Sequence, residues 1–421
     1  MATPAGGRAR LTAMPAAVPA TDRSARPEVD LLDPAFHQGD PHPAYTWMRA
    51  NEPLYRDGRN GLWAVTRHAD VLEVERNAAV FSSARGYRSW WAPEENSIIA
   101  QDDPDHLAQR RLVSDRFTPR AVRVQDDWLR STVADLLDGI EAGGPDVEVV
   151  DALAAQLPCR LTSRLLGIDE SHWTDVKGWS ERLMRIDSAP RDQVAATELF
   201  EAIGEFAQLF DAVFAERRTC PADDLSTVWA TTDLHGAGGY GPNRMIHEVG
   251  LFIAGGAETT RTVISHGLRA FADHPDQWDR LGSHPELATT AVEALVRWVT
   301  PLNNFFRTAL ADATIGGRPV GEGDRIILVY PSANRDEDVF DDPFRFDITR
   351  SPNPHVAFGH GTHFCIGANL ARYELQLRFS ELARRFEAPR VLTEPDVEPN
   401  IFARSVRSFR VELASRGSRT S

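Results

Sequence analysis

A single cysteine stands in a glycine-rich segment that reads Phe358-Gly-His-Gly-Thr-His-Phe-Cys365-Ile-Gly-Ala-Asn-Leu-Ala-Arg372. The three glycines let the backbone come close to the sulfur and leave amide N–H groups free to donate hydrogen bonds to it. The residues after Cys365 favour a helix, whose positive N-terminal end would add to this effect. The segment therefore favours a thiolate, although a buried cysteine in a turn can also be inert packing.

A second segment, Leu251-Phe-Ile-Ala-Gly-Gly-Ala-Glu258-Thr259-Thr-Arg261, concentrates poor helix formers inside an apolar helical pattern. Glycine flexibility and threonine hydroxyls both loosen the local hydrogen-bond ladder. A close contact between helices at the glycines would explain the pattern structurally. A chemical interpretation is also open, because an acid beside a hydroxyl can organise water and deliver protons. Glu258 and Thr259 are therefore candidate catalytic residues.

The two segments together resemble the signatures of the cytochrome P-450 family. Phe358, followed by glycines and by Cys365-x-Gly367, is similar to the haem-binding motif, and the residues up to Thr259 are similar to the motif of the central helix that crosses above the haem. The resemblance implies that Cys365 is the axial ligand of the iron of haem b, and thiolate donation favours O–O cleavage. It also implies that Glu258 and Thr259 take the acid and alcohol roles in dioxygen activation.

Further haem contacts follow from the same resemblance. His106 and Arg110 match a His-x-x-x-Arg pattern, in which two potential cations one helical turn apart suit a pair of propionates. Arg307 matches a third propionate contact, and His363 occupies a position that contacts a propionate in many bacterial members. Each charge alone would be read as a solvated surface group, but they occur in the order of the family. Phe358 and Gly367 are expected to bind the cofactor from the cysteine loop.

One family motif is altered. Arg297-Trp-Val-Thr-Pro301 matches the family's Arg-aromatic-x-x-Pro, but Ala294 stands where a Glu-x-x-Arg pattern requires glutamate, with Glu293 one residue earlier. In the family, that buried pair is joined by a later arginine, here Arg345. Glu293 and Arg297, four residues apart on a helix, can still form a differently aimed salt bridge. A buried Arg297 without a carboxylate would cost several kcal/mol, so we expect a substitute partner or water.

The resemblance places the substrate pocket in three segments, which are the loop from Ser83 to Ile99, the helices from about 178 to 205, and the stretch from Leu302 to Phe305. Aromatic side chains in the loop could cap a large apolar substrate, or could instead pack on neighbouring helices. The expected pocket residues are Tyr87, Trp90, Trp91, Gly255, Leu302 and Asn303.

The elements that must position these residues are mainly helical. Amphipathic periodicity predicts helices over 122–140, 192–217 and 242–272, whereas short strand patterns at 61–66, 311–315 and 325–329 predict a small sheet, with a hairpin turn around 316–320. The fold class is therefore mainly α with a small β region. The resemblance specifies it as the triangular, single-domain P-450 fold, with haem between the central oxygen-binding helix and the cysteine-loop helix.

Composition limits the other classes of function. The chain of 421 residues carries a formal charge of -15, which argues against nucleic-acid binding. No apolar run is long enough to span a membrane, and three separated cysteines fit a reducing compartment, so a cytoplasmic location is expected. Residues 1–28 lack periodicity and predict a disordered tail, with a transit peptide as the alternative. Residues 29–421 then form the catalytic domain, expected to be a monomer.

The predicted function is insertion of one oxygen atom from O2 into a hydrophobic small molecule, with electrons from a ferredoxin and its reductase. Steroids, terpenoids and other natural products are the expected substrate classes, since 350–355 resembles bacterial subgroups that oxidise such side chains. A haem-binding sensor or carrier and a peroxide-using peroxygenase are the alternatives. A cysteine hydrolase is disfavoured, because no base with an orienting acid accompanies His363. The substrate, regiochemistry and reaction subtype are not readable from the sequence.

Overall fold

The computed structural model describes residues 26–233 and 241–417. In chain order, the α-helices are α1 (Pro34–Gln38), α2 (His42–Asn51), α3 (His68–Arg76), α4 (Asp105–Val113), α5 (Pro119–Val124), α6 (Asp126–Gly143), α7 (Gln156–Leu166), α8 (Trp173–Met184), α9 (Gln193–Thr219), α10 (Leu225–Thr231), α11 (Pro242–Ile253), α12 (Thr259–Asp273), α13 (Pro275–Ser283), α14 (Ala288–Val299), α15 (Tyr330–Ala333) and α16 (Ala368–Arg385). The strands are β1 (Leu54–Asp57), β2 (Leu62–Val65), β3 (Phe81–Ser82), β4 (Asp146–Glu148), β5 (Asn304–Ala309), β6 (Ala313–Ile315), β7 (Arg318–Val320), β8 (Arg325–Val329), β9 (Arg390–Val397) and β10 (Val406–Glu412).

The long helices follow the predicted periodicity. α9 covers the predicted helix at 192–217, with Asp192 as its N-cap accepting hydrogen bonds from two backbone N–H groups. The pattern at 122–140 divides into α5 and α6 at Gln125. The pattern at 242–272 becomes α11 and α12 joined by a π-helical turn at Ala254–Glu258, where the sequence concentrates glycine.

The strands assemble mainly from two distant parts of the chain. The larger sheet has the order β1-β2-β8-β5-β3. Two strands from residues 304–329 therefore lie between strands from residues 54–82. β2 and β8 are parallel, and β5 is antiparallel to β8 with Arg307 opposite Ile326. β6 and β7 form a two-stranded hairpin that turns at Gly316 and Gly317, so residues 318–320 of the predicted turn are a strand, and β4, β10 and β9 form a separate sheet. The prediction of a small β region is confirmed.

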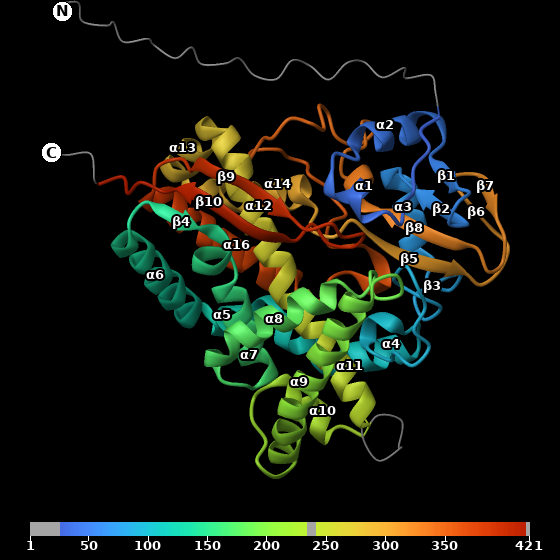
Figure 1. The fold of residues 1–421 in the computed structure, drawn as a ribbon, viewed down its shortest axis with the longest axis horizontal. Coiled ribbons are helices and arrows are strands. Elements are labelled where there is room, and N and C mark those ends of the chain that lie inside the picture. Colours follow the sequence, from blue (N-terminus) through green and yellow to red (C-terminus); the bar gives the residue numbers. More distant parts are fainter. Residues whose placement is uncertain (1–25, 234–240, 418–421) are drawn as a thin grey trace, which may run out of the picture.

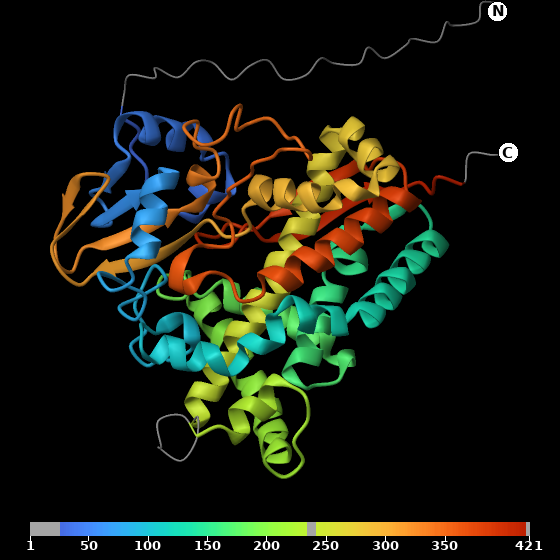
Figure 2. The ribbon, with the colours of Figure 1, turned by 180° about the vertical axis from the view of Figure 1, so that it is seen from behind.

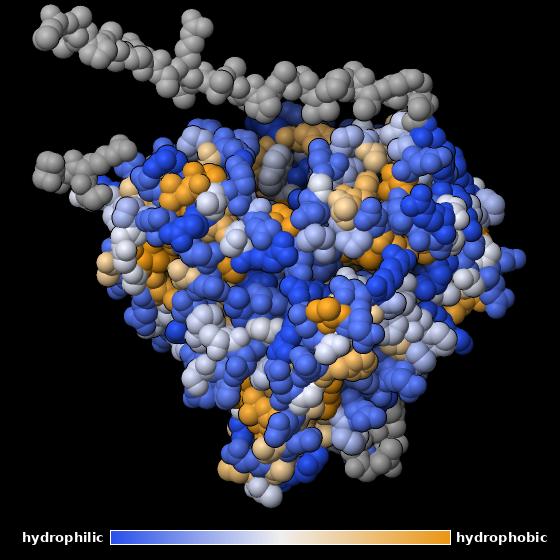
Figure 3. Space-filling model, in the orientation of Figure 1, coloured by the Kyte–Doolittle hydropathy of each residue, from blue (hydrophilic) through white to orange (hydrophobic). Residues whose placement is uncertain are grey.

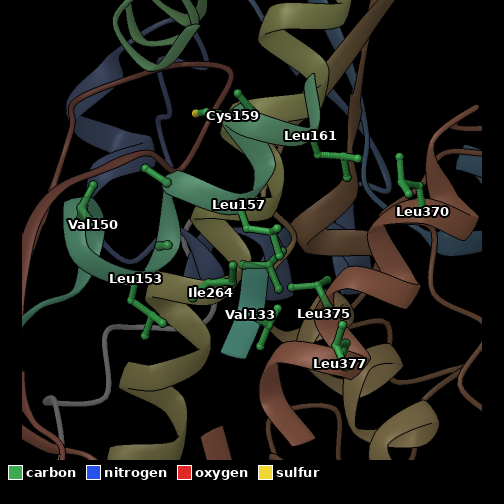
Figure 4. Packing of buried hydrophobic residues seen from close by; sticks show 14 of the residues in the cluster. Val133, Val150, Leu153, Leu157, Cys159, Leu161, Ile264, Leu370, Leu375 and Leu377 are labelled. Carbon is green, nitrogen blue, oxygen red and sulfur yellow. The ribbon is translucent and has the colours of Figure 1, made fainter. Parts of the chain in front are cut away.

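The described part of the molecule tapers from a broad edge, which carries the larger sheet and α13, towards α9 and α10 (Figures 1 and 2). α12 and α16 cross its centre and pack against α14. Gly267 of α12 allows the close approach of α16, because an added Cβ would lie 2.8 Å from the Phe379 ring. Leu157 and Leu161 of α7 face Ile264, Leu370 and Leu375 in this core (Figure 4).

The surface shown in Figure 3 is largely hydrophilic, with hydrophobic residues in scattered groups. None of the helices in the described ranges combines the length and the apolar character needed to cross a bilayer. The predicted tail at 1–28 lies mostly outside the described residues. Its last residues are held in place, because Arg26 pairs with Glu52 at 2.7 Å and Tyr55 donates a hydrogen bond to the Pro27 carbonyl at 2.7 Å. Arg26 and Pro27, which belong to the described part of the predicted tail, therefore contact the folded domain.

Candidate active site

A cavity of about 790 Å³ lies between the helices α11 and α12 and the cysteine loop. Most of the sequence-predicted site residues line it, together with a largely apolar wall. These residues are Tyr87, Trp90, His106, Arg110, Gly255, Thr259, Leu302, Arg307, Phe358, His363, Cys365 and Gly367. These residues come from five separate stretches of the chain, which therefore meet at one site.

The cysteine loop directs the thiol of Cys365 into this cavity. The Cys365 N–H donates a hydrogen bond to the Phe358 carbonyl at 2.9 Å, which closes the loop, and α16 begins just after Gly367. Gly361 is required, because its φ is +65° and an added Cβ would lie 2.3 Å from the backbone oxygen of Glu75. Burial raises the pKa of Cys365, whereas the Gly367 N–H and the nearby Arg110 and Arg372 lower it. These groups are placed to stabilise a thiolate.

Two histidines and two arginines line the cavity near one another in the structure. The His106 and His363 rings lie 4.4 Å apart, and the Nε2 atom of each is buried without a hydrogen-bond partner among the described residues. Arg110 and Arg307 line the same cavity and donate to backbone carbonyls of Phe364 and Phe306. Burial lowers the pKa of both histidines. Imidazole nitrogens without partners, which become donors when the rings are protonated, lie beside two guanidinium groups and fit the two propionates of a haem.

The predicted catalytic pair lies where α11 meets α12, but the structure separates its two members. Thr259 lines the cavity and donates its hydroxyl to the Gly255 carbonyl at 2.9 Å. Glu258, about 100° away around the helix, is fully buried and does not line the cavity. Its carboxylate pairs with Arg261, which also pairs with Glu181 at 2.5 Å. The expectation that the acid stands beside the hydroxyl in the cavity is therefore corrected to an acid held in a buried ion network.

In the altered family motif, Arg297 is buried and bonds to backbone carbonyls. Arg297 is 1% exposed and donates to the carbonyls of Asn334 and Pro343, each at 3.0 Å, and to that of Arg345 at 3.5 Å. Burial and the nearby Arg350 lower the pKa of Arg297 to about 10. Backbone oxygens therefore replace the carboxylate partner of Arg297, and neither Glu293 nor the Arg345 side chain takes part. The Arg345 side chain is largely exposed and pairs with Asp347.

Glu293 instead faces the cysteine loop. Its Oε1 atom accepts from the Nε of Arg372 at 2.6 Å, and its Oε2 atom lies 3.0 Å from a second Arg372 nitrogen and 3.1 Å from the Nε2 of His355. Burial disfavours the charge, but His355 and Arg372 together lower the pKa of Glu293 to about 2. Glu293 is therefore ionised, and it holds two residues that flank Phe358 and Cys365 in the sequence.

Two predicted pocket residues need correction. The Trp91 side chain is 46% exposed, donates to the Ala84 carbonyl at 3.0 Å, and is not among the residues lining the main cavity. Asn303 is buried, but its amide donates to the Ile401 carbonyl at 3.1 Å, away from the cavity. Alternation explains Asn303, because it lies next to Leu302, whose side chain does line the cavity, in an extended segment.

Sequence reasoning missed a buried acid at the same cavity. Glu75 of α3 lines the cavity and accepts a hydrogen bond from the Tyr330 hydroxyl at 2.6 Å. Burial raises the pKa of Glu75 to about 7, against the opposing influence of Arg307. Nothing in the local sequence of α3 distinguishes Glu75 from a solvated glutamate. Arg372 did have a signal, since an arginine seven residues after the cysteine falls about one helical turn into α16.

The comparisons with known proteins agree with this geometry. Residues 283–409 match the family model described as Cytochrome P450. A steroid C26-monooxygenase of Mycolicibacterium smegmatis is 37% identical over 378 residues, which covers 90% of this chain and 93% of the relative. The linalool 8-monooxygenase of Pseudomonas putida is 34% identical over 378 residues, covering 85% and 91%. The solved structure of Mycobacterium marinum cytochrome P450 CYP268A2 in complex with pseudoionone superposes with a TM-score of 0.84 at 34% identity, covering 92% of this chain and all of that chain.

The chain belongs to the cytochrome P450 family and is a monooxygenase of that class. The predicted recognition, fold and enzyme class are confirmed. The haem-thiolate cofactor is that of the family, and the residues that line the cavity fit it, because they include the Cys365 thiol, two guanidinium groups and two imidazole nitrogens without partners among the described residues.

Proposed function

We propose that this chain uses haem b to insert one oxygen atom of O2 into an unactivated carbon of a steroid or terpenoid, with electrons from a ferredoxin. The observation that carries the proposal is one cavity holding the Cys365 thiol, the Thr259 hydroxyl and a large apolar wall. The haem, when bound, supplies the oxygen chemistry. The protein supplies ligation, anchoring, a proton route and a dry pocket.

Cys365 would ligate the iron, with the Gly367 N–H supporting its negative charge. His106, Arg110, Arg307 and His363 would anchor the propionates, and Phe358 would pack beside the ligand. Thr259 would exchange protons with bound water at the cavity wall. Glu258 would supply protons only when its carboxylate leaves Arg261, so Arg261 and Glu181 would control the proton route.

Apolar residues would select the substrate. Tyr87, Trp90 and Leu302 line the cavity with Gly255, where the absent side chain leaves room beside the π-helical turn. Steroid C26-monooxygenases and a linalool 8-monooxygenase among the relatives support an isoprenoid substrate. The particular carbon attacked depends on how such a substrate lies against these residues.

The electron donor would dock near the cysteine loop. Arg110 of α4 donates to the Phe364 carbonyl within that loop, and α5 packs on α16. These helices carry the exposed Arg111, Arg120 and Arg123, a surface that favours an acidic ferredoxin. The monomeric state and the cytoplasmic location stay predictions.

Two spectra and one assay test the proposal. The reduced, carbon-monoxide-bound protein should show the red-shifted thiolate Soret band that defines the family, and Cys365→Ser should abolish it. With reductant and dioxygen, a steroid or terpenoid that gives a low- to high-spin shift should be hydroxylated. Thr259→Ala should divert electrons to peroxide while substrate binding persists. Turnover with peroxide but not with reductant would indicate the peroxygenase, and haem binding without any turnover would indicate a sensor or carrier.

A further inference from the structure

The carboxylate of Glu293, on α14, pairs with two residues that flank the cysteine loop. α14 presents Glu293 to Arg372 on α16 and to His355 at the start of the loop, so one carboxylate joins three segments. The contact with Arg372 is two-pronged, which fixes direction as well as distance. His355 is 2% exposed and Arg372 is 29% exposed, so water has limited access to the cluster.

Both residues held by Glu293 act on Phe358. The guanidinium of Arg372 lies over the Phe358 ring, 4.4 Å from its centroid, and the His355 ring lies 5.9 Å from the same ring. The Phe358 carbonyl in turn accepts the hydrogen bond from the Cys365 N–H at 2.9 Å. A continuous line of contacts therefore runs from Glu293 through Arg372 and Phe358 to Cys365.

We propose that Glu293 is a positioning residue for the thiolate: it clamps Arg372 and His355, and so fixes the Phe358–Cys365 loop and offsets the positive charge near the sulfur. The inference rests on the proposed role of Cys365 as the haem ligand. Glu293 touches neither the thiol nor the cavity wall, so it acts only through these neighbours. No such role follows from the family's Glu-x-x-Arg pattern, in which the glutamate would serve Arg297.

Loss of the Glu293 charge is expected to shift the reduction potential in one direction. The guanidinium of Arg372 lies over Phe358, the residue whose carbonyl accepts the hydrogen bond from the Cys365 N–H, and Glu293 pairs with that guanidinium at 2.6 Å and balances its positive charge. Removing the negative charge of Glu293 leaves the guanidinium of Arg372 uncompensated beside the thiolate, which weakens electron donation from sulfur. The ferrous state, with one more electron, is then favoured over the ferric state, so the reduction potential rises. A residue that merely held the fold together would not shift the potential in a set direction.

The decisive experiment measures the reduction potential of substrate-free, haem-loaded protein in three variants. Glu293→Gln keeps the shape and removes the charge. Glu337→Gln is the matched control, because Glu337 pairs with the buried Arg49 at 2.8 Å and neither residue lines the cavity. The third variant, Glu293→Ala with Ala294→Glu, moves the carboxylate one residue along α14, towards Arg297 and away from Arg372.

For Glu293→Gln, we expect the ferrous-to-ferric ratio at a fixed potential to rise about three- to tenfold, where tenfold corresponds to 59 mV for a one-electron couple. Haem loss should also be faster, and Glu337→Gln should match the wild type in both. The shifted-carboxylate variant should keep the raised potential even if its thermal stability recovers. Equal potentials in Glu293→Gln and Glu337→Gln would overturn the inference, as would a potential restored by the carboxylate at 294.

If the shifted variant does not fold, the comparison of Glu293→Gln with Glu337→Gln decides alone. A wild-type protein that lacks the thiolate Soret band would instead overturn the proposed ligand role of Cys365. Failure of the inference and failure of the proposed function are therefore distinguishable.

Discussion

Arg261 and Arg297 are two equally buried arginines that the protein treats in opposite ways. Arg261 is 2% exposed and Arg297 is 1% exposed. Arg261 pairs with two carboxylates, and although burial disfavours its charge, Glu258 and Glu181 raise its pKa above the ordinary value. Arg297 donates its hydrogen bonds to backbone carbonyls, and burial lowers its pKa.

The difference separates two uses of a buried cation. Arg261 restrains Glu258, a group proposed to move protons, so its pairing belongs to the chemistry. Arg297 ties α14 to the segment around Asn334 and Pro343, so it belongs to the scaffold. Neutral carbonyls suffice for a scaffold, because they satisfy donors without demanding an exact charge balance. Because Arg297 does not need a carboxylate partner, Glu293 can pair with Arg372 and His355 beside the cysteine loop.

The largest expected effect comes from breaking the charged case. Arg261→Met leaves Glu258 buried without its cation, and should destabilise the fold by about 3–5 kcal/mol in denaturant unfolding. Arg269→Met is the control on the same helix, where the exposed Glu394 is a partner. That change should cost at most about 1 kcal/mol. Equal losses in the two variants would show that the Arg261 network is not a tight ion pair.

Glu75 extends the comparison to a buried acid. Its pKa is about 7 in the fold, against an ordinary value of 4.5, so the folded state holds a proton that the unfolded state releases. The resulting stabilisation is complete below pH 4.5 and is lost as the pH rises towards 7. Glu75→Gln should remove up to about 3 kcal/mol of this pH-dependent loss.

The measurement is the free energy of unfolding of haem-loaded protein from pH 4.5 to 8. Bound propionates would raise the pKa of Glu75 further, so the sign is unchanged. Glu73→Gln, an exposed position on the same helix, is the control and should leave the pH profile as in the wild type. An unchanged profile in Glu75→Gln would contradict the prediction.

A carboxylate introduced beside Arg297 tests whether this arginine would be more stable with a charged partner, as Arg261 has. Ala294→Glu should raise the free energy of unfolding by about 1–3 kcal/mol, because a charge-assisted hydrogen bond replaces weaker ones. Ala291→Glu, one turn earlier on α14 and also buried, places a carboxylate away from Arg297 and should destabilise the protein. Destabilisation by Ala294→Glu would mean that the carbonyls already suit Arg297 better than an acid.

The smallest expected effect is at Arg345. Arg297 contacts only the backbone oxygen of Arg345, whose side chain is 65% exposed. Arg345→Ala should therefore change the thermal unfolding free energy by less than about 0.5 kcal/mol. A loss of several kcal/mol would indicate that the Arg345 side chain joins Arg297 in the core, as the family pattern implies.

Sequence patterns predicted the helices at 192–217 and 242–272, because caps and periodicity are local signals. They also gathered Cys365, His363 and Arg307 at one cavity through recognisable motifs. They could not separate Glu258 from Thr259, since the direction of adjacent side chains depends on the π-helical turn and on Arg261. Partners from distant segments were likewise invisible: Arg372 for Glu293, and carbonyls for Arg297.

The larger sheet has a consequence for how the chain is made. β2 hydrogen-bonds to β8 and β3 to β5, so strands finished by residue 82 must wait for strands that start at residue 304. At about 5–20 residues per second, a ribosome needs roughly 10–45 s to cover that interval. The edges of the early strands stay unpaired during translation, and the wall carrying Cys365 emerges later still. Capture of the cofactor is therefore expected to be one of the last events in the biogenesis of this protein.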